Sequence, residues 1–321
     1  MKTIIRAVAL TIAALFSCAT MANDAPFPSK PVTLVIPAAP GGSADAHARI
    51  LAEYLRRIWG QPVVVESRPG ANTILGTSHV AQAKPDGYTI LLNSAAFAIN
   101  PSLYKSLSYD SLTDLVPVTL LTSVPFGLVV NPDLPVETVD QFIAAAKANP
   151  AQWNLGASES SALMMGHRFN MLAGTQLQII SYKGAGPMLN DLMGGHVQAS
   201  FSALSSSQSH IRSGKLKLLG ITATSPSKLF PDAELIPNRA LPSFNASVWF
   251  GIFAPKGTPP AIVDKIHRDI TKVLQNPEAR EKLLALGVEI SGKDPGAFSQ
   301  IVRDEVALWK EVAQKAGVVP Q

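Results

Sequence analysis

The sequence predicts an α/β protein of two lobes, each built on a mostly parallel sheet. Short runs rich in Val, Ile and Leu alternate along the chain with amphipathic helical segments, which is the order found in βαβ units. The turn at 84–87 reads Lys-Pro-Asp-Gly and places Pro and Gly where a tight turn uses them. The chain has 321 residues, 47% of them hydrophobic, and a chain of this length usually divides into two domains.

The first lobe starts with strands and helices in alternation. Leu51, Leu55, Ile58 and Trp59 give the first helix an apolar stripe, and Gly60 follows its last residue. The predicted elements are strand 32–36, helix 44–59, strand 63–66, helix 73–83 and strand 88–93.

The same alternation resumes after residue 126 and predicts the second lobe. Segment 222–242 contains four prolines and is expected to form an extended surface connection. The predicted elements are strand 127–130, helix 136–148, strand 153–157, helix 162–172, strand 178–181, helix 187–193 and strand 197–201.

Two segments far apart in the sequence, 123–130 and 247–254, resemble each other. Each is an apolar strand that contains an aromatic residue and leads to a turn with proline, so the two can pair as a hinge between the lobes. Three helices in the tail, 260–274, 281–286 and 295–316, would return to cover the first lobe. We therefore expect lobe 1 to comprise residues 23–124 and 248–321, and lobe 2 to comprise residues 125–247.

The first 22 residues have the layout of a secretory signal peptide. Lys2 and Arg6 precede a mostly apolar run, and small residues lead to a cleavage site that we place after Ala22. The segment around Cys18 also loosely resembles a lipobox, which would make this cysteine a lipid anchor. The apolar run is too short to span a bilayer, and no later segment has the ~18 uninterrupted apolar residues that a spanning helix needs. We expect an exported, soluble protein.

Composition excludes several function classes. Cys18 is the only cysteine, so a chain cleaved after Ala22 has no disulfide, no thiolate nucleophile and no cysteine metal site. Cleavage also lowers the net charge from +4 to +2 and leaves no basic run longer than Arg56-Arg57, which argues against a nucleic-acid partner. The six histidines show no metal-binding spacing. We expect no metal and no cofactor.

The junction between the first strand and the first helix is the most informative segment. Gly41 and Gly42 leave the backbone uncovered, Ser43 can cap, and the first-turn amides lie at the positive end of the helix dipole. Such a site suits a carboxylate or a phosphate. The segment lacks the Gly-Lys-Ser/Thr ending of a P-loop and the GxGxxG of a dinucleotide fingerprint. A tight turn that binds nothing is the alternative.

Ligands of open α/β sheets bind beyond the carboxyl ends of the strands. Three predicted strand ends are followed by a helix start, at 39–45, 158–161 and 182–187, and two lobes with such starts could clamp an anion. Ser94 and Phe97, after another strand of the first lobe, could add hydroxyl and aromatic contacts. Ordinary helix capping is the alternative at each junction.

Enzyme signatures are weak. The SxxK patterns at 102–105 and 225–228 have neither SDN nor KTG beside them, and no GxSxG elbow occurs. Asp45 and Glu159 could serve as an acid–base pair, but nothing in the sequence places them face to face. We expect that the protein is not an enzyme.

Several motifs in order along the chain, taken together, resemble one family. These segments are Phe27-Pro28-Ser29-Lys30-Pro31-Val32, Pro40-Gly41-Gly42 to Asp45, Glu66-Ser67-Arg68-Pro69-Gly70-Ala71, Lys84-Pro85-Asp86-Gly87-Tyr88-Thr89 and Tyr182-Lys183-Gly184. The chain resembles the solute-binding proteins of tripartite tricarboxylate transporters, the Bug family. The resemblance implies a type II-like periplasmic-binding-protein fold, with mixed, mostly parallel sheets and a two-strand hinge. It also implies a periplasmic monomer that closes around a small carboxylate and delivers it to membrane permease subunits, without catalysis.

The resemblance also assigns ligand-binding residues in both lobes. With the contacts proposed after the other strands, the predicted binding residues are Ala39, Gly41, Gly42, Ser43, Ala44, Asp45, Ser94, Phe97, Ser158, Glu159, Ser160, Tyr182, Lys183, Gly184 and Ser202.

The chain departs from the family pattern at two positions. Glu159 lies in the loop before His167, where the family usually has glycine-punctuated serines, and it would repel an anion unless it points outward or meets a donor on the ligand. Ser202 stands where the family often has Asp, so a partner for a ligand ammonium is missing. We therefore expect a di- or tricarboxylate rather than an amino acid, and an aromatic dicarboxylate such as terephthalate if Phe97 and the serines hold a flat ring. A sensor that presents its ligand to a membrane receptor, or a periplasmic enzyme, is the alternative.

Overall fold

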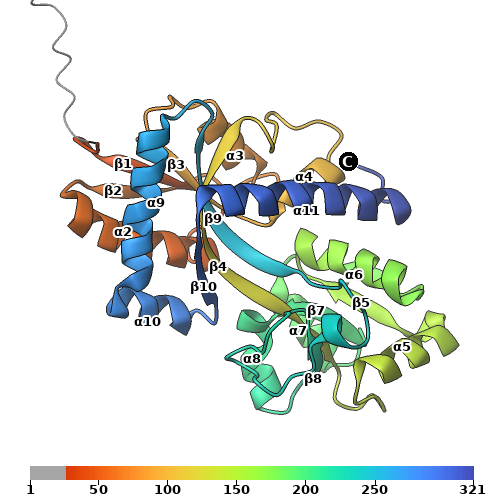
Figure 1. The fold of residues 1–321 in the computed structure, drawn as a ribbon. Helices are drawn as coiled ribbons and strands as arrows, with labels where there is room; N and C mark the ends of the chain where they lie inside the picture. Colours follow the sequence, from red (N-terminus) through yellow and green to blue (C-terminus); the bar gives the residue numbers. More distant parts are fainter. Residues whose placement is uncertain (1–26) are drawn as a thin grey trace, which may run out of the picture.

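The computed structural model describes residues 27–321 and folds them into two lobes crossed by two long strands (Figure 1). The predicted signal peptide, its cleavage after Ala22 and the alternative anchor Cys18 lie outside the described residues. Among the described helices, none is long and apolar enough to cross a membrane.

The first lobe is built on a six-stranded mixed sheet. Its order is β2-β1-β3-β9-β4-β10, with β1 parallel to β2 and β3, and with β9 antiparallel to both β3 and β4. The strands are β1 (Val32–Ile36), β2 (Val63–Ser67), β3 (Thr89–Ser94), β4 (Leu115–Val130), β9 (Ser247–Pro255) and β10 (Glu289–Lys293).

The second lobe shares β4 with the first. The last residues of β4 pair with β7 on one side and with β8 on the other, both antiparallel, and β5 lies parallel to β6 and β7. The other strands of this sheet are β5 (Asn154–Ala157), β6 (Gln178–Ser181), β7 (Ala199–Ala203) and β8 (Lys217–Ile221).

The two segments predicted to form a hinge do pair. Ser123 lies opposite Trp249, and Pro125 lies opposite Ser247, in the antiparallel pairing of β4 with β9. The predicted strand 127–130 is the end of the much longer β4. The chain therefore crosses between the lobes on two strands that are hydrogen-bonded to each other. The exact lobe boundaries stay predictions.

Helices cover both faces of the first sheet. Leu51 of α2 and Ile266 of α9 belong to the apolar core on one face, and Phe97 of α4 and Phe298 of α11 belong to the core on the other. Helix α2 ends as predicted at Gly60, which has φ 63° and donates its N–H to the Arg56 carbonyl at 3.0 Å. The helices are α2 (Ser43–Trp59), α3 (Ile74–Ala81), α4 (Ala96–Leu103), α9 (Pro260–Gln275), α10 (Pro277–Ala285) and α11 (Pro295–Lys315).

An aromatic cluster holds the second lobe together. The Phe169 ring lies 5.3 Å from Phe201 and 5.8 Å from both Phe142 and Phe244, measured between ring centroids. These contacts join α5, α6, β7 and the segment before β9. The helices of this lobe are α5 (Val139–Ala148), α6 (Ser160–Ala173), α7 (Ala185–Met193), α8 (Leu204–Arg212), and the short 3₁₀ turns η1 (Pro150–Gln152) and η2 (Ile236–Asn238).

Some elements differ from the sequence-based expectation. The sequence did not predict α4, α8, β8 or β10. Pro101 lies inside α4, α8 is rich in serine and Gly292 interrupts β10, and these residues weaken the local signals for a helix or a strand. Helix α5 begins at Val139 rather than at 136, since the Thr138 side chain caps it and accepts the Gln141 N–H at 3.2 Å. Helix α10 begins at Pro277 rather than at 281. The predicted extended loop 222–242 packs back on the sheet through buried Ile236.

A buried carboxylate joins α9 to α2. Asp269 is 2% exposed and accepts hydrogen bonds from Lys265 at 2.7 Å, Lys272 at 2.8 Å and the Trp59 indole at 2.9 Å. Burial alone would raise the pKa of Asp269, but the three donors outweigh it and hold that pKa below its usual value. The ionised carboxylate therefore stabilises the folded lobe.

Replacing Asp269 by Asn should lower the free energy of unfolding by about 2 kcal/mol at pH 7, the scale of a hydrogen bond to a charged group. Because the folded pKa is the lower one, this stabilisation is present above the unfolded value near pH 4 and disappears as the pH falls through the folded pKa. Urea unfolding of both proteins at several pH values measures the difference. The exposed Asp264→Asn on the same helix is the control. A gap that widens on acidification would contradict the assignment.

Candidate functional site

Two cavities lie on opposite faces of the hinge strands. Trp249 lines one and its neighbour Phe250 lines the other, and successive side chains of a strand point to opposite faces. We call the cavity beside the start of α2 the α2 cleft, with a volume of about 170 Å³. We call the larger one the α11 cavity, with a volume of about 690 Å³.

The α2 cleft collects strand ends and helix starts from both lobes. Ala44 belongs to the first turn of α2, Ser94 ends β3, and Glu159 precedes α6 in the second lobe. The structure thus brings together three of the predicted binding residues. The full lining is Pro37, Ala38, Ala44, Thr73, Leu92, Asn93, Ser94, Glu159, Val248 and Phe250.

The helices that begin at the predicted binding residues have no side-chain cap. Gly42, Glu159 and Gly184 occupy the N-cap positions of α2, α6 and α7, and none of them accepts a capping hydrogen bond through a side chain. Side-chain oxygens cap α5, α10 and α11, while α3, α4, α8 and α9 also lack such a cap. First-turn amides of α2, α6 and α7 therefore remain available to an anionic group.

Asp45 shapes the loop that precedes α2. Its Oδ2 accepts the Gly41 N–H at 3.0 Å and the Arg49 Nε–H at 2.8 Å, and these bonds, that of Arg49 first, lower the pKa of Asp45. Gly41 has φ 85°, a left-handed conformation that favours glycine. The Asp45 carboxylate thus holds the loop in place instead of facing the α2 cleft, and the Gly41 amide is already occupied.

His47 ties the start of α2 to the hinge. Its ring is fully buried, with Nδ1 2.7 Å from the Ser43 carbonyl and Nε2 3.0 Å from the Thr122 hydroxyl of β4. It also stacks on Phe250 at 4.5 Å between centroids. Burial lowers the pKa of His47, although the bond to Ser43 opposes this. A neutral ring that donates from Nδ1 and accepts at Nε2 satisfies both contacts.

The remaining predicted residues lie outside the lining of the α2 cleft. Ser158 and Ser160 are half-buried on either side of Glu159, and Lys183 is exposed. The Tyr182 hydroxyl donates to Asp191 at 2.8 Å, and burial together with this bond raises the pKa of Tyr182 to about 12. Ser202 is 1% exposed, which leaves its side chain no free surface in this conformation.

Phe97 requires a correction. Its ring is fully buried on α4, 4.5 Å from Phe253 and 5.9 Å from Tyr109 between centroids, so it belongs to the core and does not face the α2 cleft. The aromatic ring that lines the cleft is Phe250 of β9. In the sequence, Phe250 was marked only by its place in the second predicted hinge segment, 247–254. The unpredicted α4 turns Phe97 inward.

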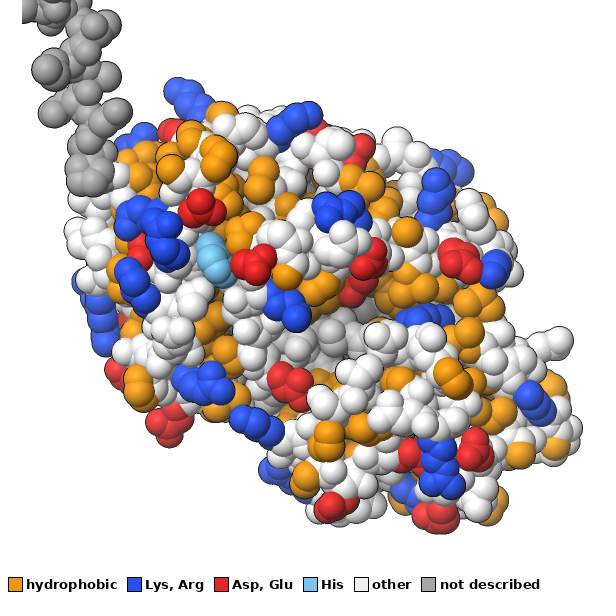
Figure 2. Space-filling view, in the orientation of Figure 1, with side chains coloured by type: hydrophobic (Ala, Val, Ile, Leu, Met, Phe, Trp, Pro, Cys, Tyr) orange, Lys and Arg blue, Asp and Glu red, His pale blue; other side chains and the backbone are white. Residues whose placement is uncertain are grey.

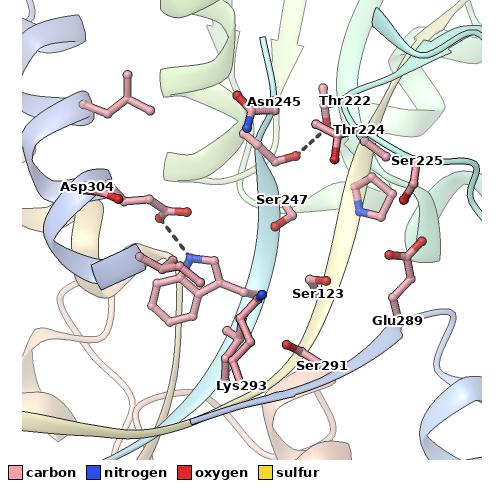
Figure 3. A pocket seen from close by; sticks show the side chains of 18 of the residues that line it. Ser123, Thr222, Thr224, Ser225, Asn245, Ser247, Glu289, Ser291, Lys293 and Asp304 are labelled. Carbon is pink, nitrogen blue, oxygen red and sulfur yellow. Dashed lines mark hydrogen bonds between the residues drawn. The ribbon is translucent and has the colours of Figure 1, made fainter. Parts of the chain in front are cut away.

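The α11 cavity was not predicted. Ser123, Ser247 and Ser291 surround its floor, and Lys293 and Asp304 lie at its side (Figure 3). The Trp249 indole donates to Glu305 at 3.0 Å, and burial raises the pKa of Glu305 to about 7 against the effect of this bond. The surface is hollowed here between the lobes, with charged side chains at the rim (Figure 2). Across residues 27–321, no group of three or more His, Cys, Asp or Glu side chains could hold a metal ion.

Comparisons with known proteins agree with this geometry. The sequence model of the tripartite tricarboxylate transporter family receptor, TctC, matches residues 47–318. BugT of Bordetella pertussis is 38% identical over 295 residues, which cover 91% of this chain and 90% of BugT.

Solved structures of similar proteins share the two-lobed fold. The periplasmic binding protein BugD is 34% identical with a TM-score of 0.75, and the match covers 92% of this chain and all of BugD. An R. palustris protein solved with adipate is 30% identical with a TM-score of 0.79, covering 92% of this chain and all of that one. MatC from Rhodopseudomonas palustris, solved with malate, is 28% identical with a TM-score of 0.75, covering 89% of this chain and all of MatC.

Replacing His47 by Gln should change how stability depends on pH. Because the folded pKa is lowered, the unfolded chain takes up a proton first, and wild-type stability falls as the pH drops below about 6.5. We expect the variant to be less stable by about 1–2 kcal/mol at pH 8, through lost stacking and weaker hydrogen bonds. The gap should narrow toward pH 5 in urea unfolding. The exposed His196→Gln is the control, and a constant gap would refute the role of His47.

Proposed function

This chain belongs to the tripartite tricarboxylate transporter receptor family, and from that premise we propose that it captures a small carboxylate in the α2 cleft and delivers it to the permease subunits of such a transporter. We place the mature protein in the periplasm, exported by its signal peptide and released after Ala22. The observation that carries the proposal is the set of uncapped helix starts that approach the α2 cleft from both lobes.

Capture is a closure of the lobes around the hinge. The first-turn amides of α2 belong to the first lobe, and those of α6 and α7 belong to the second. A ligand whose carboxylate contacts the α2 amides also reaches the second lobe only when the lobes approach each other, so the ligand favours the closed form. The paired strands β4 and β9 allow this movement with little change within either lobe.

The ligand class follows from the lining and from the relatives. Two relatives were solved with the dicarboxylates adipate and malate, so di- and tricarboxylates are the first class that we assign to the cleft. Val248, Leu92 and Phe250 give the cleft an apolar wall. Phe250 takes over the role first assigned to Phe97, because its ring can contact the flat face of an aromatic dicarboxylate such as terephthalate.

A thermal-shift screen of residues 23–321 tests the proposal. Aliphatic and aromatic mono-, di- and tricarboxylates are compared with amino acids and with inorganic phosphate. A ligand at 100 times its dissociation constant adds roughly 2.7 kcal/mol to the folded state. We expect a clear rise in melting temperature for one carboxylate class, with the compound recovered unchanged. Recovery of a chemically altered compound would favour an enzyme. If no carboxylate raised the melting temperature, the proposal would be refuted.

The start of α2 is tested by Gly42→Leu. Gly42 has φ −83°, and a Cβ there would meet only the Ala39 carbonyl oxygen at 3.7 Å, so the loop accepts a side chain. A leucine would stand over the first-turn amides and should weaken binding at least tenfold, about 1.4 kcal/mol, while the melting temperature stays close to that of the wild type. Gly296→Leu, at the first turn of α11, is the control. Unchanged affinity for the ligand found in the screen would remove this loop from the site.

A further inference from the structure

We propose that Glu159 sets the specificity of the α2 cleft by requiring a hydrogen-bond donor on the ligand. The preferred ligand is an organic acid with one ionised carboxylate and, at its other end, an amide N–H, a hydroxyl or a carboxyl that keeps its proton. The inference rests on the proposed function of the cleft and narrows the ligand class. Two roles were left open for Glu159, namely pointing outward or meeting a donor on the ligand. The inference assigns it the second role.

Glu159 contributes the only ionisable side chain to the lining of the α2 cleft. It comes from the second lobe and meets Ala44, Ser94 and Phe250 of the first lobe and the hinge across the cavity. The residue is extended, with φ −158° and ψ 169°, and its side chain does not cap α6. Within residues 27–321, no hydrogen bond or ion pair involves its carboxylate. Glu159 thus lines the cavity as a solvent-exposed residue whose carboxylate has no partner among the described residues.

Among the described residues that line the cleft, none is a Lys, Arg or His that could neutralise Glu159. Arg49 is engaged by Asp45, and His47 lies beneath Phe250 as a neutral ring. Arg168, on the same helix as Glu159, donates to the Ser243 and Asn245 carbonyls just before β9. Although Glu159 is exposed, the protein atoms around it displace part of its water, and this desolvation raises the pKa of Glu159. A ligand that brings a second ionised carboxylate beside Glu159 meets like-charge repulsion.

The start of α2 and the Glu159 carboxylate thus favour different groups on a ligand. The first favours an anion and the second favours a hydrogen-bond donor. The uncapped first-turn amides of α2, beside which Ala44 lines the cleft, donate and suit an ionised carboxylate. At α6 the resident carboxylate of Glu159 already supplies the negative charge that a helix start favours, so a ligand anion gains little there. The ionised Glu159 carboxylate can only accept hydrogen bonds, so it requires a donor from the ligand. A dicarboxylate can satisfy it with one carboxyl protonated, and its monoamide can satisfy it at any pH.

Matched pairs of diacid and monoamide test this inference. The pairs are succinate and succinamate, adipate and adipic acid monoamide, and terephthalate and terephthalamate. Within each pair the length is kept and an amide N–H replaces the second carboxylate. Isothermal titration at pH 8, where both carboxyls of each diacid are ionised, should show at least tenfold tighter binding of the monoamide in the pair that fits the cleft.

The variant Glu159→Gln should reduce this preference to less than threefold or reverse it, because a glutamine side chain can donate to a carboxylate. Thermal melting checks that the variant is folded. The exposed Glu281→Gln on α10 is the control and should keep the wild-type preference. The inference would also be supported if the variant bound diacids while the wild type bound neither the diacid nor the monoamide of the pair.

Two results would overturn it. Equal or tighter binding of the diacid by the wild type, with the same ratio in Glu159→Gln, would show that Glu159 does not select the ligand, while the proposed capture of carboxylates would stand. Failure of every diacid, monoamide and screened carboxylate to bind either protein would refute both the inference and the proposed function.

Discussion

The antiparallel pairing of β4 with β9 joins the two lobes and positions both cavities. Strand β4 spans 16 residues and belongs to both sheets, so the lobes cannot separate without breaking it. The register also assigns side chains to faces: Trp249 points to the α11 cavity and Phe250 to the α2 cleft. A slip of one residue would exchange the two rings and would place the indole against His47. Both cavities therefore depend on one set of backbone hydrogen bonds.

The start of α2 is held to this hinge by polar contacts rather than by apolar packing alone. His47 bridges the Ser43 carbonyl and the Thr122 hydroxyl, and Asp45 draws the Gly41 amide and Arg49 together. His47 and Thr122 are buried, so an unpaired polar atom on either would be costly. These contacts fix the direction of the first-turn amides before any ligand arrives. Preorganised donors of this kind reduce the ordering that binding requires.

Local signals in the sequence predicted much of the fold. Residues 32–59 carry a β-branched run, two glycines and an apolar stripe, and each of these acts within a few residues, so β1 and α2 appear where they were expected. The similarity of segments 123–130 and 247–254 predicted that these two segments pair. Phe97 and α4 show the limit of such reasoning. The position of Phe97 shortly after a strand suggested contact with a ligand, but its ring packs against Tyr109, twelve residues on, and against Phe253 from a distant part of the chain. Burial of this kind depends on tertiary contacts that no local pattern contains.

Helix α6 shows why the position of Glu159 was predictable and its surroundings were not. The strand and helix pattern places the residue at a helix start, but the partners across the cleft come from β3, α2 and β9. On the same helix, buried Arg168 donates to the backbone carbonyls of Ser243 and Asn245, just before β9. The helix is therefore anchored beside the hinge at one position and presents Glu159 to the cleft at its start. Because α6 is a single rigid element, rotation of the second lobe about β4 and β9 must move Glu159 relative to Ala44 and Phe250. In the proposed closure Glu159 therefore changes its position relative to the first lobe, and its contacts with a ligand form as the two lobes approach each other.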